Sequence, residues 1–230
     1  MKTKLEDLIS TLKKLLSPDG CDWDRAQTNE SLIPYMLEEV YEVIEAIENK
    51  DDELLKEELG DLLLHVIFQA ELANQNKKFN IYDCINNINT KLIDRHPQVF
   101  NKTSQPTTSN INWESQKYLE KERKSRLDGV PSILPSIIFS QRIQEKASLA
   151  GFDWDNIENV WSKIEEEINE LKIAQKKNDL ENIHEEIGDL LFTVINLSRH
   201  LGISAENALR KSNQKFIRRF QLLECEISDL

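Results

Sequence analysis

Glycine and proline are scarce in this chain of 230 residues, which contains only six of each. Because tight turns between short strands consume these two residues, their scarcity argues against a β-sandwich or a β-barrel. Cysteine is scarce as well, since Cys21, Cys84 and Cys225 are widely spaced and form no CxxC pair. This odd, scattered set predicts free thiols in a reducing compartment, and neither a disulfide framework nor a zinc site.

Long apolar runs and a targeting segment are also missing. No stretch of the chain approaches the roughly 18 consecutive apolar residues of a membrane-spanning helix. The first residues carry Lys2, Lys4, Glu6 and Asp7, and they lack the apolar core of a secretory signal. We therefore expect a soluble protein of the cytoplasm that has no membrane partner.

Basic residues are in deficit, with 29 Lys and Arg against 41 Asp and Glu and a formal net charge of −12 at pH 7. A protein that coats nucleic acid needs lysine and arginine to displace the counterions of the phosphate backbone. We therefore expect no nucleic-acid partner. A small molecule that carries phosphates would have to be held by a local basic patch or through metal ions.

An internal duplication is visible in the chain. Four blocks of the first half recur in the same order in the second half: residues 20–24 as 151–155, 38–42 as 166–170, 58–63 as 186–191, and 89–95 as 213–219. Four matching blocks in one order predict two copies of a single module, which we call the first and the second repeat. Turn-forming residues at 128–131 and Pro135 mark the division between them.

The periodicity within each repeat is that of a helix. Apolar residues at Leu37, Val40, Tyr41, Ile44 and Ile47 follow one helical face and fit no strand. We predict an all-α fold of two tandem helical bundles, with a first domain at 1–127, a linker at 128–134 and a second domain at 135–230. The predicted helices cover residues 4–16, 30–49, 52–75, 81–95, 113–126, 136–149, 157–177, 179–201 and 205–227.

Acidic residues in the first repeat follow a spacing that brings them together. Glu39 and Glu42 lie three residues apart, as do Glu58 and Asp61, so each pair shares one helical face. If the two helices turn back on each other near Lys50, the four carboxylates stand at the same height. The second repeat contains the same pattern around Asn178, in Glu167, Glu170, Glu186 and Asp189.

Two interpretations of these carboxylates compete. Most glutamate clusters on helices are solvated surface, and we interpret Glu45, Glu48 and Glu53 in that way. Asp61, however, lies beside the apolar residues 62–64 and 66–68, and acids are rarely buried unless they are paired or bind a metal. An all-oxygen ligand set without cysteine favours Mg²⁺, with Mn²⁺ as the alternative, over zinc.

A di-iron carboxylate centre is a further alternative. Such a centre needs two Glu-x-x-His motifs, and only Glu181 with His184 fits, because Lys56 occupies the matching position of the first repeat. His65 lies near the first set of carboxylates, but Thr193 replaces it in the second repeat. We therefore interpret both histidines as structural or incidental.

Two basic pairs recur at matching positions. Lys91 and Arg95 lie four residues apart, as do Lys215 and Arg219, so each pair presents two cations on one helical face. Beside a set of carboxylates loaded with metal, such a pair suggests an oligophosphate lying between them. Neither a GxxxxGK[ST] loop nor a GxGxxG loop is present, so phosphate binding by backbone amides is not indicated.

These motifs together resemble a known family. The GCDWD block at residues 20–24, the paired EExxE and ExxD motifs, and KLIDRHPQVF at 91–100 resemble the MazG family of nucleoside triphosphate pyrophosphohydrolases. The resemblance covers nearly the whole chain and both repeats. It implies an all-α fold whose bundles pair into a homodimer. It also implies Mg²⁺-dependent hydrolysis of nucleoside triphosphates to monophosphate and pyrophosphate.

The resemblance also implies roles for individual residues. Glu39, Glu42, Glu58 and Asp61 would be metal ligands, as would Glu167, Glu170, Glu186 and Asp189. Lys215 and Arg219 would contact the triphosphate, and Lys163 would line the same pocket. Family members usually continue past this point with a tryptophan near the nucleotide. The first repeat has Trp113, but the second domain is short at its C-terminus and has no counterpart, so the first repeat is also a candidate active site.

The mechanism we expect uses one or more Mg²⁺ ions between the carboxylates and the phosphates, with the basic pair orienting the leaving pyrophosphate. Glu38 or Glu166, just outside the ligand set, could accept the proton of the attacking water. Two other functions stay open on the sequence. One is a helical nucleotide-binding scaffold or sensor that has lost catalysis. The other is a narrow pyrophosphatase for dUTP or a modified nucleotide.

Overall fold

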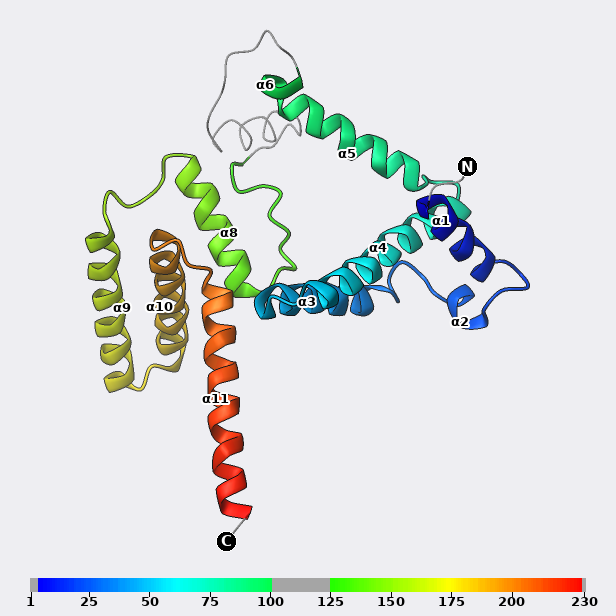
Figure 1. Ribbon diagram of the computed structural model, residues 1–230. Coiled ribbons are helices and arrows are strands. Elements are labelled where there is room, and N and C mark those ends of the chain that lie inside the picture. Colours follow the sequence, from blue (N-terminus) through cyan, green and yellow to red (C-terminus); the bar gives the residue numbers. More distant parts are fainter. Residues whose placement is uncertain (1–3, 101–124, 229–230) are drawn as a thin grey trace. The chain divides into compact units, whose positions relative to one another are not determined.

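The computed structural model describes residues 4–100 and 125–228, and every regular element in these two ranges is a helix. The chain divides into two compact units, residues 1–106 and 107–230, each of which contains one repeat (Figure 1). The all-α fold with two tandem modules is thus confirmed. Within the described ranges, no helix is both long enough and apolar enough to cross a membrane.

The first unit contains six helices in its described part. They are α1 (Lys4–Leu15), α2 (Asp22–Arg25), α3 (Ile33–Asn49), α4 (Asp52–Gln75), α5 (Ile81–Arg95) and α6 (Pro97–Phe100). The four long helices match the predicted ranges to within a few residues. The one-turn helices α2 and α6 were not predicted, because a single turn is too short to show a helical period.

The hairpin of α3 and α4 has a short and well-defined turn. Lys50 closes α3 in the left-handed conformation, with φ 56°, and the next residue, Asp51, caps α4 by accepting a hydrogen bond from the Leu54 amide at 3.0 Å. This places the reversal at the position that the spacing of the carboxylates requires. The two helices therefore run antiparallel from one tight corner.

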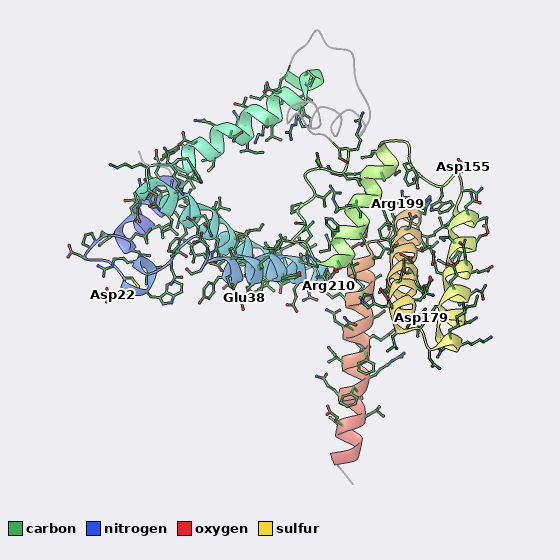
Figure 2. The ribbon with its side chains drawn as sticks, turned by 180° about the vertical axis from the view of Figure 1, so that it is seen from behind. Asp22, Glu38, Asp155, Asp179, Arg199 and Arg210 are labelled. Atoms are coloured by element: carbon green, nitrogen blue, oxygen red, sulfur yellow. The ribbon has the colours of Figure 1, made fainter. Side chains whose placement is uncertain are left out.

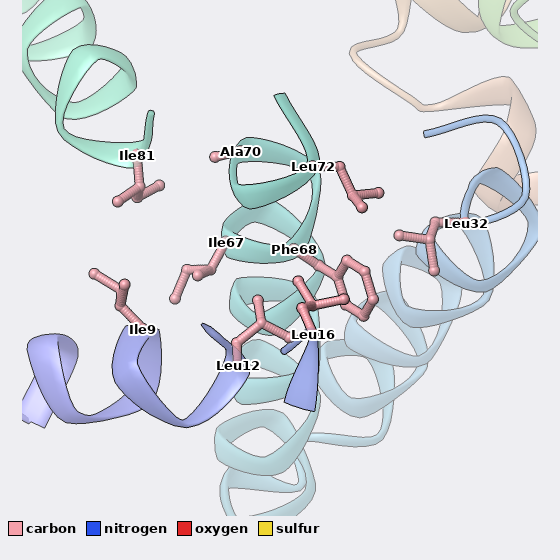
Figure 3. Packing of buried hydrophobic residues seen from close by; sticks show 9 residues of the cluster. All are labelled: Ile9, Leu12, Leu16, Leu32, Ile67, Phe68, Ala70, Leu72 and Ile81. Atoms are coloured by element: carbon pink, nitrogen blue, oxygen red, sulfur yellow. The ribbon is translucent and has the colours of Figure 1, made fainter. Parts of the chain in front are cut away.

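The core of the first unit lies between α1 and the second half of α4 (Figure 3). Leu12 and Leu16 pack there against Ile67 and Phe68, and all four side chains are buried. Leu32, at the start of α3, is buried in the same cluster. The amphipathic α1 is thus held on the hairpin by burial of its apolar face.

The second unit repeats the hairpin. Its helices are α8 (Ser136–Leu149), α9 (Ile157–Lys177), α10 (Leu180–His200) and α11 (Ala205–Ser228). Asn178 forms the corner with φ 52°, and Asp179 caps α10 through the Asn182 amide at 3.2 Å. Figure 1 shows α9 and α10 side by side. The buried cluster between them is small and consists of Val160, Ile164 and Leu197.

The segment before α8 contains no helix from residue 125 to residue 135, only turns and bends. Most of the predicted helix at 113–126 lies outside the described residues, and its last two positions, Ser125 and Arg126, are not helical. The division at 128–134 stays a prediction. The hydroxyl of Ser204, the residue before α11, accepts a hydrogen bond from the Asn207 amide at 3.3 Å.

Replacement of Phe68 by alanine should destabilise the first unit by about 3–5 kcal/mol, because a buried aromatic side chain leaves a cavity when it is truncated. Phe68 is 4% exposed, whereas Phe79 is 46% exposed. Phe79→Ala is therefore the matched control and should cost much less. Urea unfolding followed by circular dichroism measures both variants. Equal losses in the two variants would contradict the assignment of the core.

Candidate metal centres

The hairpin of α3 and α4 gathers acidic side chains from both of its helices. One carboxylate oxygen from each of Glu39, Glu58 and Asp61 can be chosen so that all three lie within 4.8 Å of one another. Glu42, one turn beyond Glu39, is close enough to raise the pKa of both Glu39 and Glu58. The structure thus brings three of the four expected residues together, with Glu42 within electrostatic reach, and Asp61 is exposed where burial was expected. Their binding of a metal stays a prediction.

The electrostatics of this first centre are unfavourable without a cation. Burial, followed by repulsion from Asp61, Glu42 and Glu58, raises the pKa of Glu39. The pKa of Glu58 is raised by burial and then by the carboxylates of Glu42 and Asp61. Like charges held this close favour protonation or a bound cation. A set of hard oxygen ligands fits a divalent ion such as Mg²⁺ or Mn²⁺.

His65 lies at the edge of the first centre and is not one of the three converging groups. Its Nε2 is 3.8 Å from Oε1 of Glu39, and its Nδ1 is buried without a hydrogen-bond partner. Burial lowers the pKa of His65, against the opposing effect of Asp61. In the second repeat the matching Thr193 donates to the Asp189 carbonyl at 2.9 Å. The two repeats therefore share only their carboxylates here.

The hairpin of α9 and α10 forms the second centre. Glu167, Glu170 and Glu186 each offer a carboxylate oxygen within 4.8 Å of the others. Burial and then the charges of Glu170, Glu167 and Asp189 raise the pKa of Glu186. The fourth expected residue, Asp189, is thus within electrostatic reach of the group. The two converging groups share two equivalent positions, Glu39 with Glu167 and Glu58 with Glu186, and differ in the third, which is Asp61 in the first and Glu170 in the second.

Lys163 holds one side of the second centre. Its Nζ is 2.8 Å from Oε1 of Glu166 and 2.8 Å from Oε1 of Glu167. These hydrogen bonds raise the pKa of Lys163 and keep it charged. Glu167 is only 3% exposed, and a carboxylate at that depth requires a cationic or hydrogen-bonding partner. Lys163 therefore fixes the most buried acid of the centre.

The other predicted residues lie apart from the carboxylates. Lys215 and Arg219 are exposed in the middle of α11, and within residues 125–228 neither forms an ion pair with the second centre. Lys91 and Arg95 lie near the end of α5, which diverges from α4 (Figure 1). Trp113 lies outside the described residues. The basic pairs stay predicted phosphate contacts.

The predicted general bases differ in their surroundings. Glu38 is exposed on α3 (Figure 2). Glu166, its counterpart on α9, is exposed, and its Oε1 accepts a hydrogen bond from Lys163. Both are adjacent in sequence to a residue of the converging group, as expected. Neither is a member of that group.

A cavity of about 640 Å³ opens beside the second centre. Lys163, Glu167 and Asp189 line one part of it, and Leu127, the segment 152–154, α8 and α10 supply the remaining walls. Arg199, which also lines the cavity, pairs with both carboxylate oxygens of Asp153, with Nη1 at 2.9 Å from Oδ2. Although burial opposes ionisation, hydrogen bonds from Arg199 and Ser148 hold the pKa of Asp153 well below its usual value.

The motifs of the sequence did not predict Asp153 and Arg199 as residues of the cavity. Asp153 lies within the recurring block at 151–155, but its partner Arg199 matches Glu71 of the first repeat. Similarity between the repeats marked the carboxylates, whereas the cavity depends on positions at which the repeats differ. The positions at which the two aligned repeats differ were the signal that could have indicated these residues.

An all-α chain with two hairpins, each gathering carboxylates from both of its helices, defines a class of helical proteins with acidic groups that could hold a metal ion. The chain belongs to the MazG family. The family model, described as the MazG nucleotide pyrophosphohydrolase domain, matches residues 27–100 and residues 156–222. Each match contains one hairpin and its carboxylates. The resemblance drawn from the motifs is thus confirmed.

Several relatives match nearly the whole chain. The nucleoside triphosphate pyrophosphohydrolase/pyrophosphatase MazG of Thermotoga maritima is 50% identical over 221 residues, which is 95% of this chain and 85% of the relative. The nucleoside triphosphate pyrophosphohydrolase of Escherichia coli K12 is 41% identical over 229 residues, covering 96% of this chain and 87% of the relative. The uncharacterized protein YabN of Bacillus subtilis is 39% identical over 94% of this chain and 45% of its own length.

Addition of Mg²⁺ to the metal-free protein should raise its melting temperature, because a bound cation relieves the repulsion among the carboxylates. The pKa values of Glu39, Glu58 and Glu186 are raised above the ordinary 4.5. Protons therefore compete with the metal at a higher pH than they do at an isolated glutamate. The increase should be full near pH 7 and should decline as the pH falls through these raised values. Differential scanning calorimetry across this range measures it.

A matched pair of variants tests whether the carboxylates cause the increase. Glu186→Gln removes a converging ligand, whereas Glu181→Gln changes an exposed glutamate in the first turn of the same helix. The first variant should lose part of the increase and the second should keep all of it. An equal increase in both would argue against the second centre.

Proposed function

We propose that this protein catalyses the Mg²⁺-dependent hydrolysis of nucleoside triphosphates to nucleoside monophosphate and pyrophosphate, and that it cleans the nucleotide pool of the cytoplasm. Membership of the MazG family and the names of the relatives from Thermotoga maritima and Escherichia coli support this activity. The observation that carries it in this chain is the convergence of Glu167, Glu170 and Glu186 beside a cavity of about 640 Å³.

The reaction adds water to the α-phosphorus of the nucleotide and breaks the bond between that phosphorus and the oxygen bridging to the β-phosphate. When bound, the divalent ion neutralises charge on the phosphates and lowers the pKa of a coordinated water. The residues that would hold it are Glu39, Glu42, Glu58 and Asp61 in the first repeat, and Glu167, Glu170, Glu186 and Asp189 in the second.

Other side chains would position the reactants. Lys163, held between Glu166 and Glu167, keeps the buried ligand Glu167 in place and lines the same cavity. Lys215 and Arg219 would orient the leaving pyrophosphate as its charge develops. Glu38 in the first repeat or Glu166 in the second would accept the proton of the attacking water. For Glu166 this requires the oxygen that does not bond to Lys163.

Substitution of one carboxylate in each repeat tests the proposed activity. Glu39→Gln and Glu167→Gln each keep the size of the side chain but remove a charged oxygen ligand. The double variant should lose pyrophosphate release on the order of 10²-fold or more, because the electrostatic stabilisation of the transition state is removed. Pyrophosphate release with Mg²⁺ measures the effect, and the remaining product should be the monophosphate.

Glu165→Gln is the control for this experiment, since Glu165 is exposed on α9 and is not one of the converging groups. It should keep full activity. Full activity in the double variant would remove the carboxylates from the mechanism. Nucleotide binding without any turnover by the unsubstituted protein would favour a scaffold or sensor instead.

We also propose that the protein is a homodimer. On α11, Phe216 and Phe220 are 68% and 50% exposed, and their rings stack with centroids 6.2 Å apart. Leu223, one turn further along this face, is exposed as well. Contiguous apolar side chains of this size are rarely left in water, and a second copy of the same helix would cover them.

Replacement of Phe216 and Phe220 by glutamate should convert the dimer to a monomer, because it places charges in the proposed apolar contact. Gln221→Glu adds a charge to the same helix away from that face and should leave the dimer intact. Sedimentation equilibrium gives the mass of each variant. An unsubstituted protein that sediments as a monomer at all concentrations would contradict the proposal.

A further inference from the structure

The two carboxylate centres differ at the helical position one turn before their first acid. Four residues before Glu167 lies Lys163, and four residues before Glu39 lies Tyr35. Because residues four apart lie on one face of a helix, each of these side chains is on the side of its centre. The first repeat therefore has a phenol without positive charge where the second repeat has an ammonium group.

Lys163 is bound to the second centre by two short contacts. Its Nζ lies 2.8 Å from Oε1 of Glu166 and 2.8 Å from Oε1 of Glu167. Hydrogen bonds to these two carboxylates raise the pKa of Lys163, so the ammonium group stays charged at neutral pH. The side chain of Glu167 is only 4% exposed, and a buried pair is screened little by salt and water. One positive charge thus lies against the most buried acid of the second centre.

The first centre has no such charge in the part of the chain described at residues 4–100. No lysine or arginine of that range forms an ion pair with its four carboxylates. Tyr35 instead packs edge-on against Trp23, with ring centroids 5.9 Å apart. His65 approaches Glu39, but its Nε2 remains 3.8 Å from Oε1, which is longer than a hydrogen bond. The acids of the first centre are therefore balanced by less positive charge than those of the second.

A divalent ion would meet different conditions at the two centres. At the second, it would lie beside the ammonium group of Lys163 and would compete with that group for a carboxylate oxygen of Glu167. Because like charges repel, a bound ammonium group lowers the affinity of a site for a cation. At the first, burial and mutual repulsion raise the pKa of Glu39 and Glu58, and a cation would relieve that repulsion without a competitor. The first centre should therefore bind a divalent ion more tightly.

We propose that the first centre is a resident metal site, occupied without nucleotide, and that the second is an exchangeable site in which Lys163 balances the acids until a metal enters. Without nucleotide, the first centre should bind Mg²⁺ or Mn²⁺ about tenfold more tightly than the second, or better. This inference rests on the carboxylate centres of the proposed function, but it concerns the metal alone and does not depend on hydrolysis. A metal at the first centre would join α3 to α4, whereas the second centre stays open to a metal that arrives with phosphates.

Variants that keep a single centre measure the two affinities separately. Glu58→Gln with Asp61→Asn leaves the second centre, and Glu170→Gln with Glu186→Gln leaves the first. Titration of each metal-free variant with Mn²⁺, followed by the electron paramagnetic resonance signal of the free ion, gives its Kd. The variant that keeps the first centre should have a Kd about tenfold lower, or less. Equal Kd values, or tighter binding at the second centre, would overturn the proposal.

Removal of the charge of Lys163 tests the cause of the difference. In the chain that keeps the second centre, Lys163→Met retains an unbranched side chain but removes the ammonium group, so the Kd for Mn²⁺ should fall about tenfold. Lys176→Met is the matched control, because Lys176 is exposed in the last turn of the same helix, and it should leave the Kd nearly unchanged. An equal fall in both variants would overturn the proposal, since the effect would then depend on net charge and not on the contact with Glu167.

The reciprocal exchange covers the case in which Lys163→Met fails to fold around an unpaired Glu167. Tyr35 is 42% exposed, so Tyr35→Lys introduces an ammonium group at a position of the first repeat that can accept it. In the chain that keeps the first centre, this variant should weaken Mn²⁺ binding about tenfold. Tyr35→Met removes the phenol without adding a charge and should keep the Kd. An unchanged Kd in Tyr35→Lys, or an equal loss in Tyr35→Met, would overturn the proposal.

Metal binding and hydrolysis together separate a failure of this inference from a failure of the proposed function. If both centres bind Mn²⁺ with the same Kd and pyrophosphate is released, the function stands and the difference between the centres is wrong. If the expected difference is found and no pyrophosphate is released, the inference stands and the proposed hydrolysis is wrong. If the unsubstituted protein binds no Mn²⁺ at all, both are wrong.

Discussion

Repulsion among carboxylates held on a tight helical hairpin is the constraint on which the rest of the structure depends. Left-handed corners at Lys50 and Asn178 fix the register of each hairpin, and that register sets acids from opposite helices within 4.8 Å of one another. Burial and mutual repulsion then raise the pKa of Glu39, Glu58 and Glu186. Like charges held this close favour protonation or a bound cation, so part of the acidic excess of the chain lies where a divalent ion would be stabilised.

Much of this arrangement could be predicted from the sequence, because it depends on local rules. Helical periodicity predicted the long helices, and pairs three residues apart with a turn midway predicted which acids converge. The one-turn helix α2 has no such period. The pair of Asp153 and Arg199 joins a loop to the end of α10, and no spacing rule relates those two positions. The cavity arises from missing volume, which depends on three-dimensional packing.

Duplication explains how one fold combines packing with an open site. Ala147 and Asn196 leave space in the second repeat where Leu16 and Phe68 provide packing in the first. The buried cluster of the second hairpin is correspondingly limited to Val160, Ile164 and Leu197 with their neighbours. A cavity removes dispersion contacts between buried apolar side chains, and these contacts stabilise a core. The two repeats can therefore carry different shares of stability and ligand binding.

Both units leave large apolar side chains exposed to solvent. Leu59 and Val66 are examples in the first unit, and Trp161, Leu191 and Phe216 in the second. Burial of such side chains against a second copy would supply apolar contact that the single chain lacks. The proposed dimer would thus bury apolar side chains that neither unit covers by itself, and the stacked pair Phe216 and Phe220 on α11 is the clearest case.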